Sequence, residues 1–118
     1  MADLTKALAA ATNAINTEIS ALNNFAKTLE ANLKPALEIL AESKGHVVIT
    51  GLGKSGLVGA KIAATLSSTG TPSFFLHSAD ALHGDSGALT PGDILIAISN
   101  SGETAEVNAL VTMAKGWG

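Results

Sequence analysis

Three short aliphatic runs, each followed at once by a segment rich in glycine, serine or charge, constrain this fold more than any other feature. The runs are residues 46–50, 72–76 and 94–98, and helical patterns follow the first and the third over 54–68 and 102–115. Strands that alternate with helices indicate a parallel sheet with right-handed crossovers. The sequence therefore predicts an α/β fold around a partial parallel sheet of about three strands.

The first third of the chain has a different character, because no glycine interrupts it before Gly45. Apolar residues recur there every three or four positions, which places them on one face of a helix. Pro35 lacks the N–H that would continue the helical hydrogen bonds, so we expect a long helix ending near Leu33 and a short one over 35–42. The apolar face comprises Leu4, Leu8, Ala11, Ile15, Ile19, Leu22, Phe25, Leu29 and Leu33.

These patterns divide the chain into a helical arm, residues 1–44, and a sheet domain, residues 45–118. The apolar face of the arm is too large for its short neighbour to cover, so we expect it to pack on the sheet domain, on another subunit, or on both. A heptad coiled coil is an alternative, although the face is rich in Ala and irregularly spaced. A small parallel sheet also has an unpaired edge and an uncovered face. We therefore expect a homo-oligomer, a dimer or a tetramer.

Composition narrows the possible partners and the compartment. The 118 residues suit one domain, and their net charge of −3 provides no basic patch, so no nucleic-acid partner is expected. No apolar run is long enough to cross a bilayer, and the N-terminus lacks the charged region and apolar core of a secretory signal. We therefore expect a cytoplasmic protein with no membrane partner. Cysteine is absent, so disulfides are excluded.

Ligands of open parallel sheets bind beyond the carboxyl ends of the strands. Three polar segments, residues 51–56, 77–85 and 99–104, follow the three predicted strands and should meet there. Their coincidence is stronger evidence for a ligand site than any one motif.

The first segment spells G-x-G-x-x-G between a strand and a helix. A dinucleotide site would need an acidic residue after the second strand, but that strand ends Phe74–Leu76 without one. A P-loop would need glycine where Val48 stands. What remains is an anion site made by the backbone N–H groups of a turn with Gly53 and Gly56, together with Lys54. The alternative is a tight turn whose glycines only permit helix–strand contact.

The third segment is a serine-rich turn before the last helix. Helix capping by Ser101 or Asn100, helped by Glu103, explains part of its composition. Capping does not explain four hydrogen-bonding side chains in six residues around a glycine. A phosphate accepts many hydrogen bonds, so we favour a phosphate site. Its predicted residues are Ser99, Asn100, Ser101 and Thr104, around Gly102.

The middle segment adds His77 and His83. For His83 two roles stay open: a general acid or base or a ligand, against a structural histidine that holds a loop. For His77 the structural role is favoured. The three histidines do not form a pair at the helical spacing of metal ligands, so we expect no cofactor and no metal, with His83 as the one possible metal ligand.

Four motifs in register resemble the sugar isomerase (SIS) domain, and most closely the bacterial arabinose-5-phosphate isomerases. The resemblance runs from about Gly45 to Leu110 and implies the three-layer parallel sheet of the SIS type. The motifs are residues 51–56 (GLGKSG), 68–72 (STGTP), 81–85 (ALHGD) and 98–104 (ISNSGET).

The resemblance implies interconversion of D-ribulose 5-phosphate and D-arabinose 5-phosphate, which feeds synthesis of the lipopolysaccharide sugar Kdo. It also implies that the serine-rich turn, with Ser55, holds the sugar phosphate. Lys54, His83 and Glu106 match residues of the family's active site. An aldose–ketose isomerase needs a base and a group that stabilises an oxyanion. Glu106 suits the first role and Lys54 the second, and His83 suits proton transfer to a hydroxyl or ring opening; alternatively, Glu106 is a solvated helix residue.

Family domains continue with further strands and helices beyond the point where this sequence ends. We therefore expect phosphate binding, because its turns are present, and doubtful isomerase activity. Two other functions stay open: a non-catalytic sugar-phosphate sensor acting on a protein partner, and a structural module that assembles through the helical arm.

Overall fold

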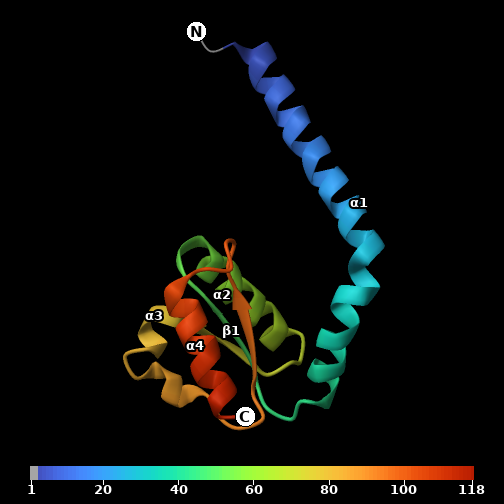
Figure 1. Ribbon diagram of the computed structural model, residues 1–118. Helices are drawn as coiled ribbons and strands as arrows, with labels where there is room; N and C mark the ends of the chain where they lie inside the picture. The colour runs from blue at the N-terminus through green and yellow to red at the C-terminus, as the bar shows by residue number, and fades with distance from the viewer. Residues whose placement is uncertain (1–2) are drawn as a thin grey trace. The chain divides into compact units, whose positions relative to one another are not determined.

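The computed structural model describes residues 3–118 (Figure 1). Met1 and Ala2, with which the predicted arm begins, lie outside the described residues. The chain forms three strands and four α-helices, with one 3₁₀ turn within the described part. In chain order these are α1 (Leu4–Glu42), β1 (Val47–Gly51), α2 (Gly53–Ser68), β2 (Ser73–His77), α3 (Ser78–Ala81), η1 (Asp85–Ala88), β3 (Ile94–Ile98) and α4 (Ala105–Gly116).

The three strands form one parallel sheet in the order β2-β1-β3, which confirms the predicted α/β class. The central strand β1 is buried along its whole length, whereas most residues of the two outer strands are only partly buried. Gly51 at the end of β1 stands opposite His77 on one side and Ile98 on the other. The strands therefore end in one row, so the segments that follow them start side by side.

Two apolar clusters cover the two faces of the sheet. Alternate residues of a strand point to opposite faces, so neighbours in β1 enter different clusters. On one face Val47 and Ile49 pack with Ala63 of α2, and on the other Val48 packs with Leu110 of α4. The helices α2 and α4 accordingly lie on opposite sides of the sheet (Figure 1). The expected uncovered face is therefore wrong, because α3 and α4 occupy it.

The arm differs from its prediction at Pro35, where α1 continues without a break to Glu42. Proline removes one helical hydrogen bond and crowds the preceding turn, which bends or breaks many helices. Here residues of high helix propensity stand on both sides of Pro35, from Leu33 to Glu38, and they allow the helix to continue past it. One compact unit ends at Ile39 and a second spans Leu40–Gly118, while the division into 1–44 and 45–118 stays a prediction.

The apolar face of α1 is exposed, and none of the residues of this helix is buried. Leu22 is 67% exposed and Phe25 is 54% exposed. Among residues 3–118, no helix combines the length and the apolar character that crossing a bilayer requires.

A hydrogen-bonded carboxylate joins the segments that precede β1 and β3. Asp93 Oδ1 accepts the backbone N–H of His46 at 2.7 Å, and Oδ2 accepts the backbone N–H and the hydroxyl of Thr90 at 2.8 and 2.9 Å. Burial alone would raise the pKa of Asp93, whose side chain is 4% exposed. The hydrogen bonds from His46 and Thr90 outweigh burial and hold this pKa below its ordinary value. The charged form of Asp93 therefore stabilises the fold.

We expect Asp93→Asn to lower the free energy of unfolding by about 1–3 kcal/mol at pH 7, because an amide N–H₂ would face donors of Thr90. A carboxyl whose folded pKa lies below its unfolded pKa stabilises the protein above the unfolded value, and this contribution disappears as pH falls through the folded value. The difference between variant and wild type should therefore shrink in acid, below about pH 4. Urea unfolding at pH 7 and pH 3 measures both effects. Asp80→Asn, at an exposed carboxylate, is the control, and an equal loss at both pH values would contradict the assignment.

Candidate functional site

A cavity of about 290 Å³ lies where the first and third strands end. The cavity therefore joins the two turns for which the sequence predicted anion binding. Lys54, Ser55 and Val58 line it from α2, and Ile98, Ser99 and Asn100 line it from β3 and the turn after it. Two of the three predicted segments, 51–56 and 99–104, thus meet at the carboxyl edge of the sheet, whereas no residue of 77–85 lines the cavity.

The first turn leaves the N-terminus of α2 open to an anion. Leu52 occupies the N-cap position in an extended conformation and offers no side-chain hydrogen bond to the helix. The first turn of α2 also contains no acidic residue. The first N–H groups of a helix have no partner within the helix, and they carry its positive dipole end. Lys54 adds a full positive charge there, so this turn is electropositive.

Glycine lets α2 start almost in contact with the end of β1. A Cβ atom on Gly56 would lie 3.1 Å from the carbonyl oxygen of Gly51 and 3.3 Å from Phe75. The backbone oxygen cannot move without shifting the strand. Gly56 therefore serves the helix–strand contact that the alternative interpretation of this turn predicted, and by this contact it fixes where the turn stands.

The second turn, residues 99–104, is a network of internal hydrogen bonds. Ser99 Oγ accepts the backbone N–H of Gly102 at 3.0 Å and lies 2.9 Å from Thr104 Oγ1. Ser101 Oγ accepts the backbone N–H of Glu103 at 3.1 Å. Gly102 has a φ of +72°, which glycine adopts without strain. Because these residues form a turn, α4 begins at Ala105 and not at Gly102 as the pattern predicted.

This network determines which hydroxyl protons of the turn are used in internal hydrogen bonds and which remain available. A serine hydroxyl has one proton to donate and two lone pairs to accept. Ser101 Oγ uses a lone pair for Glu103 N–H, so its proton stays available. In the pair of Ser99 and Thr104, one hydroxyl donates to the other, which leaves one proton of the pair available. The turn therefore keeps at least two hydroxyl protons that its internal bonds do not use, and of its three hydroxyl residues Ser99 lines the cavity.

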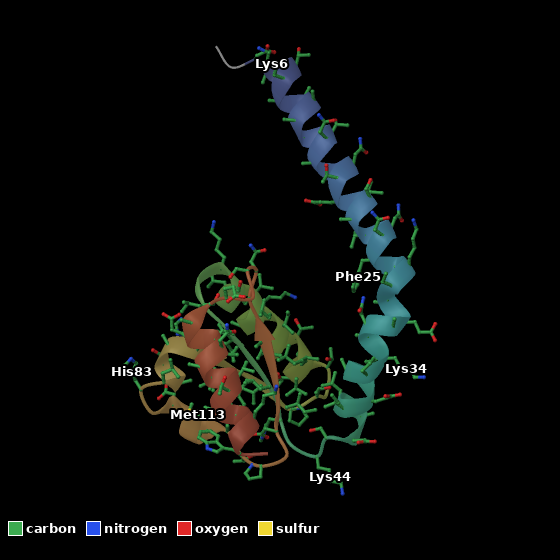
Figure 2. The ribbon with its side chains drawn as sticks, viewed as in Figure 1. Lys6, Phe25, Lys34, Lys44, His83 and Met113 are labelled. Carbon is green, nitrogen blue, oxygen red and sulfur yellow. The ribbon has the colours of Figure 1, made fainter. Side chains whose placement is uncertain are left out.

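The three predicted catalytic residues lie at different positions relative to the cavity. Lys54 lines the cavity. Glu106 is half-buried in the first turn of α4, next to the serine-rich turn, but is not among the residues that line the cavity. His83 is exposed on the loop after α3 and projects outward from it (Figure 2). Of the predicted phosphate residues, Ser55, Ser99 and Asn100 line the cavity together with Lys54. Ser101, Thr104 and His83 are not among the residues that line it.

Sequence reasoning missed two kinds of residue at this site. Val58 and Ile98 form the apolar part of the cavity wall, and their aliphatic character was interpreted only as core or helix pattern. Asn108, in α4, donates from its Nδ2 to the carbonyl oxygen of Gly102 at 3.1 Å. No spacing in the sequence marks this contact, because it depends on the path of the turn back toward the helix.

Three further polar atoms are buried near the carboxyl edge. Ser78 Oγ donates to the carbonyl oxygen of Gly51 at 3.3 Å and ties the start of α3 to the end of β1. Within residues 3–118, Thr50 Oγ1 and His77 Nδ1 are buried without a hydrogen-bond partner. Nδ1 of His77 lies 3.8 Å from a carboxylate oxygen of Asp80, beyond hydrogen-bond distance.

The cavity near the C-terminus of α4 offers less to a charged ligand. A second cavity, of about 320 Å³, lies toward the C-terminus of α4 and is lined mainly by apolar residues that include Leu89, Leu95 and Trp117. It contains none of the predicted site residues. In the part of the chain that the structure describes, no three histidine or acidic side chains gather as a metal-binding group.

We expect Gly56→Ala to lower the free energy of unfolding by about 1–2 kcal/mol. Overpacking against the backbone of Gly51 costs about 1–3 kcal/mol, and the better helix propensity of alanine offsets up to about 1 kcal/mol of this. Gly87→Ala is the matched control, since its added Cβ meets nothing within 4 Å. Thermal unfolding compares the two variants. Equal stability of both would contradict the close approach of α2 to β1.

The comparisons with known proteins agree with this geometry. The sequence profile of the SIS domain matches residues 39–118. Arabinose 5-phosphate isomerase KpsF of Escherichia coli O6:H1 (strain CFT073) is 53% identical over 100 residues, which are 84% of this chain and 31% of that protein. Arabinose 5-phosphate isomerase KdsD of Pseudomonas aeruginosa is 50% identical over 101 residues, 86% of this chain and 31% of that protein. The chain thus spans about a third of the length of these curated relatives.

Two solved structures share the fold. Escherichia coli CFT073 c3406 in complex with arabinose 5-phosphate superposes on the whole chain and on 62% of its own, with a TM-score of 0.88 and 38% identity. Tagatose-6-phosphate ketose/aldose isomerase from Escherichia coli has a TM-score of 0.71 and 25% identity, over 84% of this chain and 28% of its own. The profile match covers most of the chain and includes both turns of the cavity. The chain therefore belongs to the SIS domain family.

Proposed function

We propose that this chain supplies the phosphate-binding half of a sugar-phosphate isomerase site. One observation carries the proposal: the two turns share one cavity, with Lys54 and Ser55 on one side and Ser99 and Asn100 on the other. A phosphate dianion needs positive charge and many hydrogen-bond donors, and both are present around this cavity. The open helix N-terminus supplies backbone N–H groups, and the serine-rich turn supplies O–H groups.

We propose the interconversion of D-arabinose 5-phosphate and D-ribulose 5-phosphate as the reaction. The identity of about half over most of this chain to proteins named arabinose 5-phosphate isomerases supports this substrate. The complex of a similar structure with arabinose 5-phosphate supports it too. The resemblance further suggests a cytoplasmic role in supplying the lipopolysaccharide sugar Kdo.

The proposed chemistry moves one proton between two carbons. A base takes the proton from C2 of the open-chain aldose, the electrons form an enediolate, and the proton returns at C1 to give the ketose. We assign the base to Glu106, which stands half-buried in the first turn of α4, next to the serine-rich turn. Lys54 would stabilise the developing oxyanion, because its ammonium group borders the cavity. His83 would transfer a hydroxyl proton or open the ring, which requires the loop after α3 to approach the ligand.

A second candidate is binding without turnover, as in a sugar-phosphate sensor. The position of His83 favours it, because this side chain is exposed and outside the cavity that Ser55, Ser99 and Asn100 line. The same ligand would then bind with similar affinity and would not be converted.

We also propose that the chain acts as a homo-oligomer. The exposed apolar face of α1, with Leu22 67% exposed and Phe25 54% exposed, supports this proposal. Large apolar patches on soluble proteins commonly mark interfaces. Static light scattering at micromolar concentration should give twice or four times the mass of one chain, and a well-folded monomer would contradict the proposal.

We expect the chain to bind D-arabinose 5-phosphate, and Lys54→Ala to weaken that binding about tenfold or more and to abolish any turnover. Loss of a charge-assisted contact to a phosphate or oxyanion has this magnitude. Lys61→Ala on the same helix is the control, because Lys61 contacts Thr65 and does not line the cavity. Calorimetry measures binding, and ¹H NMR of the sugar measures conversion. Binding without conversion in the wild type would favour the sensor, and no binding would reject the phosphate site.

We expect Ser99→Ala to weaken sugar-phosphate binding about tenfold. The substitution removes the acceptor of Gly102 N–H and the partner of Thr104, so the turn loses two of its hydrogen bonds. Ser68→Ala, at an exposed hydroxyl that bonds within α2, controls for the loss of a serine. Titration with D-arabinose 5-phosphate measures both variants. An affinity equal to that of the wild type would show that the serine-rich turn does not bind the phosphate.

A further inference from the structure

The peptide unit between Gly102 and Glu103 is held at both ends. Its carbonyl oxygen, on Gly102, accepts a hydrogen bond from Asn108 Nδ2 at 3.1 Å. Its N–H, on Glu103, donates to Ser101 Oγ at 3.1 Å. A carbonyl and the N–H that follows it belong to one rigid plane, so fixing one end fixes the direction of the other.

Gly102 also gives this peptide rotational freedom. Gly102 has no Cβ and stands at a φ of +72°, so other orientations of the following peptide cost it little. If the plane turned, Glu103 N–H would leave Ser101 Oγ. The hydroxyl of Ser101 would then lose the donor that occupies one of its lone pairs and orients it.

Asn108 supplies the constraint from a rigid element. It stands in the second turn of α4, and its own backbone N–H donates to Thr104 O at 2.9 Å as one of the first hydrogen bonds of that helix. Only the N–H₂ end of its amide can face a carbonyl oxygen as a donor, which sets the orientation of the side chain. The side chain therefore reaches six residues back along the chain, to the centre of the turn.

We infer that Asn108 is a positioning residue for phosphate binding: through the Gly102–Glu103 peptide it holds Ser101 Oγ with its proton free for the ligand. This inference rests on the proposed function of the serine-rich turn. Neither Asn108 nor Ser101 lines the cavity, and Ser101 directly follows Asn100, which does. Asn108 therefore acts through the turn and not by contact with the ligand.

The test compares Asn108→Ala with Asn108→Gln, which keeps an amide donor, and with Thr112→Ala as the control. Thr112 bonds to the backbone carbonyl of Asn108 on the same helix and does not reach the turn. Asn108→Ala should raise the dissociation constant for D-arabinose 5-phosphate about fivefold, the effect of losing one hydrogen bond. It should also speed the hydrogen exchange of the Glu103 amide, measured by ¹⁵N NMR without ligand. Asn108→Gln should recover part of both effects, and Thr112→Ala should change neither.

The remaining results each support or contradict either the role of Asn108 or the proposed function. Wild-type affinity and unchanged Glu103 exchange in Asn108→Ala would overturn the inference, and so would an equal loss in Asn108→Ala and Asn108→Gln, because the donor would then be irrelevant. If the wild-type protein binds no sugar phosphate, the proposed function fails. The hydrogen exchange of the Glu103 amide then tests separately whether Asn108 fixes the Gly102–Glu103 peptide. Faster exchange in Asn108→Ala supports this part of the inference, and an unchanged rate rejects it.

Discussion

The close contact between the end of β1 and the start of α2 is the constraint on which the rest of the site depends. β1 is buried on both faces, so its position is fixed by the two apolar clusters around it. Gly56 brings the backbone of α2 against the carbonyl of Gly51. An interior packed this closely leaves little freedom to shift. The N-terminus of α2 therefore stands at a defined place above the sheet edge.

The same strand fixes the second turn through the parallel register. Ile98 ends level with Gly51, so the serine-rich turn starts beside the N-terminus of α2. The two turns then present different donors to one cavity. The helix end offers backbone N–H groups and Lys54, whereas the serine-rich turn uses its own N–H groups internally and leaves hydroxyl protons free. A positively charged helix end and a turn rich in hydroxyl groups thus border one cavity, and a phosphate needs both charge neutralisation and directed hydrogen bonds.

The opposite edge of the sheet is stabilised by other means. There the buried carboxylate of Asp93 accepts hydrogen bonds from His46 and Thr90 and holds the starts of β1 and β3 together. Local patterns gave no sign of this link, because Pro91-Gly92-Asp93 is typical of any turn. The outer strands remain partly exposed, so β1 is the most buried strand of the sheet. The site lies at the end of that most buried strand.

Sequence by itself determined the class of fold, the three strands to within one residue, and the glycine- and serine-rich turns that meet at the sheet edge. These features follow from local pattern: aliphatic runs, the breaks between them, and side chains that hydrogen-bond within six residues. Tertiary structure alone decided that α1 passes through Pro35, that α3 and α4 cover the second face, that His83 stays outside the cavity, and that Asn108 reaches Gly102. Such outcomes depend on the path of the chain between elements and on the residues that pack around each side chain. The spacing of residue types along the sequence indicates neither of them.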